Sequence, residues 1–200
     1  MTESTTNRHA VVIPGGGYGP QAPLLAYAAD AAEARRARVH PISWTADPRK
    51  VPPDDRQGWV AAQVAPVLDE LETRTAPPQP DELTAPPPAG IPLLIGKSFG
   101  TYAAALAADR GLPAVWLTPL LTNETVVASL RQATAPALLV GGTADPLWDG
   151  QLARQLSPYV LEVTDADHGM YLPGPLAGSA AVLGRVATAV EEFLDDVLWR

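Results

Sequence analysis

The residues best suited to chemistry stand in a short turn with the pattern G-x-S-x-G, residues 96–100, which contains Ser98. The apolar run at residues 91–95 precedes this serine turn, and the alanine-rich stretch at residues 102–108 follows it, so it lies between a predicted strand and a predicted helix. A strand that reverses into a helix within a few residues forces the serine into a strained backbone conformation, where flanking glycines avoid clashes. We therefore predict that Ser98 is a nucleophile.

A serine hydroxyl needs a general base at neutral pH, normally an imidazole that a carboxylate holds in one tautomer. The chain has three histidines. His9 and His40 each stand at the start of a predicted strand, whereas ligands of parallel sheets gather at the strands' carboxyl ends. His168 follows the last predicted strand, and we predict that it is the base for Ser98.

Several aspartates compete for the role of the orienting carboxylate. Asp145 follows the fifth predicted strand, and Asp149 stands a few residues further on. Asp165 and Asp167 flank the predicted base more closely in sequence. We favour Asp145 because a glycine-rich turn lets a short side chain point back over the sheet, whereas Asp149 has the position of a helix N-cap.

Acyl transfer also needs donors for the negative charge of its tetrahedral intermediate, and backbone N–H groups usually supply them. The N–H of Phe99 follows the predicted nucleophile at the start of a helix. A glycine-rich segment, residues 15–19, follows the first predicted strand and can approach a ligand closely. Gly16 and Gly17 are both candidates there, and the sequence does not choose between them.

Two nucleotide-binding patterns are excluded by spacing. A P-loop ending at residues 96–98 would need glycine at position 91, which is isoleucine. The glycine loop also fails G-x-G-x-x-G, since the last position is Pro20 or Ala22, depending on the starting glycine. The chain has no cysteine and a formal charge of −8, which argue against thiolate metal sites and against nucleic acid. We expect no cofactor and no metal.

The rest of the chain alternates between short apolar runs and helical stretches. This alternation predicts a parallel sheet with helices on both faces, in one α/β domain spanning residues 9–200 after a frayed tail at residues 1–8. The expected strands are residues 9–13, 39–44, 91–95, 114–117, 137–140 and 159–163, and the expected helices lie at about 24–38, 56–74, 102–108, 123–132, 150–156 and 179–198.

Other segments are predicted to be peripheral. We expect the proline-bearing residues 76–90 to form a stiff surface connection. Pro66 is expected to kink or divide its helix. A polar N-terminus and the lack of a long apolar run predict a cytoplasmic protein without a membrane partner.

Together, the glycine loop, the serine turn, Asp145 and His168 resemble the α/β-hydrolase family, and the resemblance covers nearly the whole chain from residue 9. It implies a three-layer sandwich whose six-stranded sheet has the order 2-1-3-4-5-6. It also implies that Ser98 forms an acyl-enzyme, with His168 as base and then acid. Residues 118–134 have room for only one crossover helix, so no lid domain is expected.

An open site of this kind would be lined by apolar and aromatic loop residues, and Tyr18, Trp148, Met170 and Tyr171 are the candidates. The sequence thus predicts a serine hydrolase for small carboxylic esters or thioesters. Two alternatives stay open: a catalytically silent binding protein of the same fold, and an acyltransferase that uses an acceptor other than water.

Overall fold

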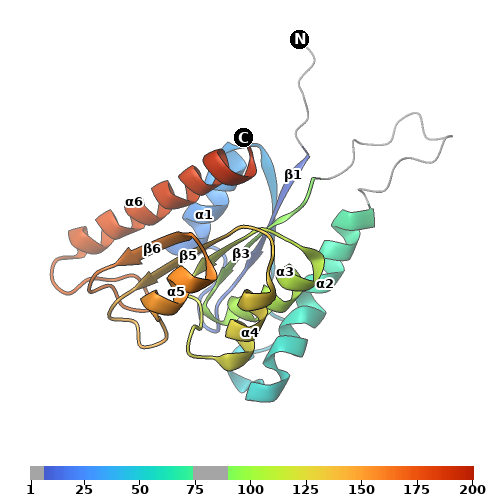
Figure 1. Cartoon of the computed structure of the whole chain (residues 1–200), viewed down its shortest axis with the longest axis horizontal. Coiled ribbons are helices and arrows are strands. Elements are labelled where there is room, and N and C mark those ends of the chain that lie inside the picture. Colours follow the sequence, from blue (N-terminus) through green and yellow to red (C-terminus); the bar gives the residue numbers. More distant parts are fainter. Residues whose placement is uncertain (1–6, 74–89) are drawn as a thin grey trace, which may run out of the picture.

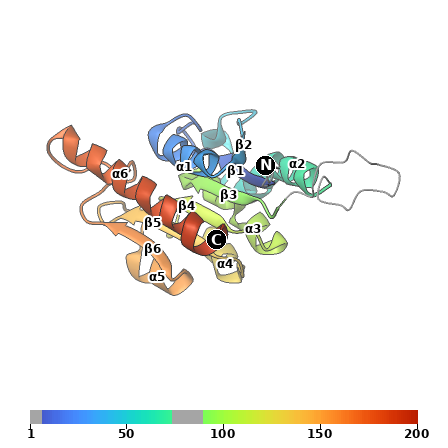
Figure 2. The same ribbon diagram turned by 90° about the horizontal axis from the view of Figure 1, so that it is seen from above.

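The computed structural model describes residues 7–73 and 90–200, which form a three-layer sandwich around a fully parallel six-stranded sheet. The strand order β2-β1-β3-β4-β5-β6 is the predicted one and is visible from above in Figure 2. The proline-bearing segment lies outside the described residues, apart from Gly90, as does most of the expected tail. The strands are β1 (Arg8–Ile13), β2 (Ala37–Pro41), β3 (Leu93–Lys97), β4 (Ala114–Leu117), β5 (Ala137–Gly142) and β6 (Tyr159–Val163).

Helices cover both faces of this sheet. Helices α1 and α6 lie side by side on one face, and α2, α3, α4 and α5 cover the other (Figure 1). Only α4 lies between β4 and β5, so the described chain has no lid domain there. The helices are α1 (Pro23–Ala34), α2 (Arg56–Thr73), α3 (Ala104–Arg110), α4 (Glu124–Gln132), α5 (Gly150–Leu156) and α6 (Leu176–Phe193), with 3-10 turns η1 (Pro48–Lys50), η2 (Pro53–Asp55) and η3 (Ser98–Ala103) and a π-helical turn η4 (Leu194–Leu198).

The core forms two apolar layers because successive strand residues point to opposite faces. In β3, Leu93 and Ile95 pack with α1 and α6, whereas Leu94 packs with the other helices. Trp116 of β4 is fully buried in that second layer. Residues on both faces are apolar, and this explains why the central strands read as continuous apolar runs.

Several local predictions differ from the structure. Strand β2 covers residues 37–41 rather than 39–44, and β3 covers residues 93–97 rather than 91–95, so that it includes Lys97. Helix α1 ends at Ala34 rather than Arg38, because Arg36 adopts a left-handed φ of 63° and the chain then enters β2 at Ala37. Arg35 stabilises this end by donating to the carbonyl of Ala31 and by pairing with Asp195 at 2.6 Å. Helix α2 continues through the exposed Pro66 and is not divided there.

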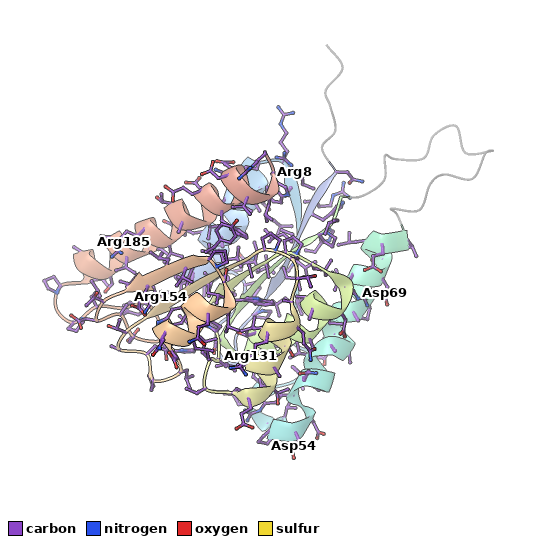
Figure 3. The ribbon with its side chains drawn as sticks, in the orientation of Figure 1. Arg8, Asp54, Asp69, Arg131, Arg154 and Arg185 are labelled. Carbon is purple, nitrogen blue, oxygen red and sulfur yellow. The ribbon has the colours of Figure 1, made fainter. Side chains whose placement is uncertain are left out.

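Charged side chains gather on the outside of the molecule. Figure 3 shows Asp69 on α2, Arg154 on α5 and Arg185 on α6 at its periphery. Within residues 7–73 and 90–200, no helix is long and apolar enough to cross a membrane. The same residues contain no cluster of His, Asp and Glu side chains that could hold a metal ion.

Candidate active site

The serine turn has the strained geometry that its pattern predicts. Ser98 directly follows β3 with a φ of 50°, and the chain then enters η3 and α3. A Cβ atom on Gly96 would lie 2.5 Å from the ring of Trp116, and one on Gly100 would lie 2.7 Å from the carbonyl oxygen of Ile13. Both positions therefore require glycine because neighbouring elements approach them closely.

Ser98, His168 and Asp145 are joined by two hydrogen bonds. His168 Nδ1 lies 2.7 Å from Asp145 Oδ2, and His168 Nε2 lies 2.8 Å from Ser98 Oγ. Since a carboxylate only accepts, Nδ1–H donates to Asp145, and Nε2 is left to accept the serine hydroxyl proton. This is the geometry in which an imidazole can take a proton from a serine nucleophile.

Hydrogen bonds fix both the backbone and the carboxylate of Asp145. It is 3% exposed, its backbone N–H donates to the carbonyl of Gly142, and its Oδ1 accepts from the N–H of Leu147 at 2.9 Å. The competing Asp149 caps α5 by accepting from Leu152 at 2.9 Å. The structure thus brings Asp145, rather than Asp149, to His168.

The aspartates nearest to His168 in sequence do not bond to its ring. Asp167 Oδ1 accepts from the N–H groups of Gly169 and Tyr171, at 2.8 and 2.9 Å. Asp165 has a left-handed φ of 59° and donates its N–H to Thr143 Oγ1. Both residues shape the histidine loop, residues 164–175, which joins β6 to α6.

Backbone donors lie beside Ser98. Phe99 is in the first turn of η3, where an amide N–H has no intrahelical acceptor. The glycine loop, residues 15–19, lies against this turn, since a Cβ on Gly16 would be 3.8 Å from the Cβ of Phe99, whereas one on Gly17 would meet nothing within 4 Å. Gly16 therefore lies close to Phe99.

Three of the four predicted lining residues surround one cavity. Tyr18, Met170 and Tyr171 bound an apolar cavity of about 210 Å³, whose wall also includes Gly169, the residue after His168. Burial raises the pKa of Tyr18, whose hydroxyl accepts from the N–H of Leu24. The other lining residues are Pro23, Leu24, Gly169, Leu176, Ser179, Ala180 and Leu183.

Trp148, the fourth predicted lining residue, has different neighbours. Its ring packs so closely on Gly141 that a Cβ there would lie 2.1 Å from it, and its indole N–H donates to Glu162 at 2.8 Å. These contacts place Trp148 between β5, β6 and α5, outside the lining of the cavity.

The remaining histidines contact each other. His9 Nδ1 and His40 Nε2 lie 2.9 Å apart in the neighbouring strands β1 and β2, and His9 is buried. His9 lies near the start of β1 as predicted, whereas His40 is the fourth of the five residues of β2 rather than at its start, because β2 begins at Ala37.

Lys97, beside Ser98, is a residue whose importance sequence reasoning missed. It is 3% exposed, and its Nζ donates to Thr118 Oγ1 at 3.1 Å and to the carbonyl of His168 at 3.2 Å. Burial lowers the pKa of Lys97 to about 8, against the opposing effect of Asp145 and Asp167. No sequence signal pointed to this role, because the predicted strand ends at residue 95, whereas β3 extends to Lys97 in the structure.

The parallel sheet, the helices on both faces and the serine turn after β3 define the fold of the α/β hydrolases. The sequence matches no protein-family model, and no curated protein matches it. Solved structures resemble this chain instead. Their sequence identities to it are low, so the resemblance establishes only the fold.

An α/β serine hydrolase homologue from Coxiella burnetii superposes with a TM-score of 0.65 at 17% identity, over 94% of this chain and 85% of that one. A serine hydrolase without a lid from Xanthomonas campestris gives 0.64 at 16% identity, over 98% and 86% of the two chains. Est1E from Butyrivibrio proteoclasticus with bound ferulic acid gives 0.65 at 14% identity, over 99% and 92%.

Proposed function

We propose that this protein is a serine hydrolase that cleaves small carboxylic esters or thioesters through an acyl-enzyme on Ser98. The observation that carries the proposal is the pair of hydrogen bonds, 2.8 and 2.7 Å, that join Ser98 to His168 and His168 to Asp145. The fold supports a hydrolase, since its structural neighbours include serine hydrolases and lipolytic enzymes.

In the first half-reaction, Ser98 Oγ attacks the carbonyl carbon of the substrate while His168 Nε2 takes the hydroxyl proton. The carbonyl oxygen becomes an oxyanion, which the N–H of Phe99 and that of Gly16 or Gly17 stabilise. When the intermediate collapses, the bond to the leaving alcohol or thiol breaks, and His168 gives that group the proton.

In the second half-reaction, water attacks the acyl-enzyme and His168 takes one of its protons. The bond between the acyl carbon and Ser98 Oγ then breaks, and the proton returns to Ser98 as the carboxylic acid leaves. Asp145 orients the imidazole in both half-reactions, because its buried carboxylate accepts the Nδ1–H.

The apolar cavity beside the histidine loop supports a small substrate. Its volume of about 210 Å³ suits a short acyl chain or a single ring. Est1E, which shares the fold, is seen with ferulic acid, a small aryl carboxylic acid. We assign Tyr18, Met170 and Tyr171 to substrate binding on this basis.

A fluorophosphonate probe tests the proposal, because it labels only a serine that a neighbouring base activates. We expect labelling of the folded protein at Ser98 and none in Ser98→Ala, with peptide mapping to locate the adduct. If the folded wild-type protein is not labelled at neutral or mildly alkaline pH, the hydrolase proposal is wrong and a silent binding protein replaces it. Added alcohols that divert the acyl group from water would indicate acyl transfer instead.

A further inference from the structure

Lys97 places a charge where the fold calls for an apolar side chain. Residues alternate along β3, so Lys97 points to the same face as Leu93 and Ile95, which pack with α1 and α6. A buried ammonium group costs free energy unless its protons are bonded, and a leucine or methionine would fill this position without that cost. The lysine therefore needs an explanation other than packing.

The contacts of the ammonium group supply one. Its nitrogen donates to Thr118 Oγ1 and to the backbone carbonyl of His168, and it lies 4.8 Å from the ring centroid of Tyr18. No carboxylate in the described part of the chain forms an ion pair with it. Neutral groups from three loops stabilise the charge of the ammonium group, and one of these groups is the backbone carbonyl of His168, the proposed base.

The histidine loop benefits from such an attachment. It contains two non-glycine residues with left-handed φ angles, Asp165 and Met170, and the side chain of His168 is 32% exposed. Asp165 and Ala166 are bonded through their backbone to the loop after β5. The side chain of Asp167 bonds only to amides of its own loop, at Gly169 and Tyr171. The hydrogen bond from Lys97 instead ties His168 to β3, one residue before Ser98.

We propose that Lys97 is a positioning residue, which holds the backbone of His168 at a fixed distance from the strand that carries Ser98. The inference rests on the proposed function. A displacement of about 1 Å between nucleophile and base is enough to lower turnover by roughly 100-fold. Lys97 acts through His168 and makes no contact with the reacting atoms.

The protonation state of Lys97 gives the link a pH dependence. Three titratable groups face it: Asp145 and Asp167, which favour its charged form, and Tyr18, while His168 contacts it through the backbone carbonyl. Its pKa of about 8 means that the ammonium loses a proton as the pH rises through that value, which weakens its hold on the two acceptors and on the ring. We expect the reactivity of wild-type Ser98 to fall across this range.

The decisive variant is Lys97→Met, which keeps an unbranched side chain of similar size and removes the donor. We expect kcat and the labelling rate of Ser98 to fall by roughly 10- to 100-fold while KM changes little. The alkaline decline near pH 8 should disappear. Hydrogen exchange should become faster at residues 165–172, a readout that does not depend on activity.

Thr118→Val is the matched control, because it removes one acceptor of Lys97 and keeps the bond to His168. We expect a smaller loss than in Lys97→Met, and equal losses would overturn the inference. Lys97→Gln retains an N–H donor without the charge and should recover part of the activity. It replaces Lys97→Met in the test if Lys97→Met does not fold.

The outcomes separate the two proposals. If wild-type Ser98 does not react with the probe, the hydrolase proposal fails, whereas the hydrogen-exchange comparison still tests the attachment of the loop. If the wild type reacts and Lys97→Met reacts at the same rate with the same pH profile, the positioning role is wrong and the hydrolase proposal stands.

Discussion

Asp145 contacts His168 through one carboxylate oxygen while its other oxygen accepts the N–H of Leu147. The side chain is fully buried, so water does not compete for either oxygen. A side chain that must accept one hydrogen bond at each of its two terminal atoms has to be a carboxylate, since an amide offers only one acceptor atom.

Asp145→Asn should therefore lower kcat by about 10³- to 10⁴-fold, because the amide favours the wrong tautomer of His168 or loses the contact with Leu147. Steady-state kinetics with a small aryl ester measures the effect. Asp149→Asn is the control, since asparagine caps helices about as well as aspartate and should leave kcat within about two-fold. A large loss in Asp149→Asn and a small one in Asp145→Asn would reassign the carboxylate.

Gly100→Ala should destabilise the protein by about 1–3 kcal/mol, because the added methyl group meets the carbonyls of Ile13 and Pro14 at 2.7 and 3.0 Å. Urea unfolding of both variants measures the change. Gly184→Ala is the control, as its Cβ meets nothing within 4 Å in the middle of α6. That variant should gain about 0.5–1 kcal/mol from helix propensity. Equal changes in the two variants would contradict the role of close approach at Gly100.

The free energy of unfolding should depend on Lys97 between about pH 8 and 10.5. Burial lowers the pKa of Lys97 in the folded protein to about 8, from its ordinary value of 10.5. The unfolded chain binds the proton more tightly, so the charged form destabilises the fold below pH 8, by up to about 3 kcal/mol, and this cost disappears as the pH rises.

The comparison that isolates this effect is Lys97→Met against wild type. The stability of the variant relative to wild type should be highest near pH 7 and should decline toward pH 10. Tyrosine ionisation is common to both proteins and cancels in the difference. A difference that is independent of pH would show that the ammonium is not destabilised by burial.

The cavity beside the histidine loop should limit the size of the substrate. Ala180→Phe adds a ring at its lining, and we expect it to lower kcat/KM for butyrate and hexanoate esters by roughly 10-fold or more relative to acetate esters. Ala181→Phe is the control, because the neighbouring residue of α6 is exposed and does not line the cavity. If both variants shift the preference equally, the cavity does not hold the acyl group.

Most of the fold follows from local patterns. The strands at 114–117 and 159–163 have the predicted bounds, because apolar runs between turn residues are the signal of buried strands. The end of α1 was missed, since it depends on the contacts of Arg35 with α6 and η4, which are distant in sequence. The predicted helix at 102–108 is preceded by the 3-10 turn η3, which the pattern did not specify and in which Gly100 packs closely on β1.

The candidate site was predictable to a different degree at each residue. Chain order and turn chemistry identified Ser98, Asp145 and His168 as a set, and their hydrogen bonds now connect them. The sequence patterns assign Lys97 no role, because its partners, Thr118 and His168, are 21 and 71 residues away in sequence. Contacts of that range are a property of the assembled sheet, and a local pattern does not contain them.

The two hydrogen bonds of His168 span 70 and 23 residues, and they reach from the centre of the sheet to the loop beyond its edge strand β6. No partly assembled chain that lacks β5 or β6 can present all three groups. The reactivity of Ser98 therefore reports on the completeness of folding. In a denaturation series it should vanish no later than the circular-dichroism signal, and an earlier loss would reveal that the β6 edge opens before the rest of the molecule.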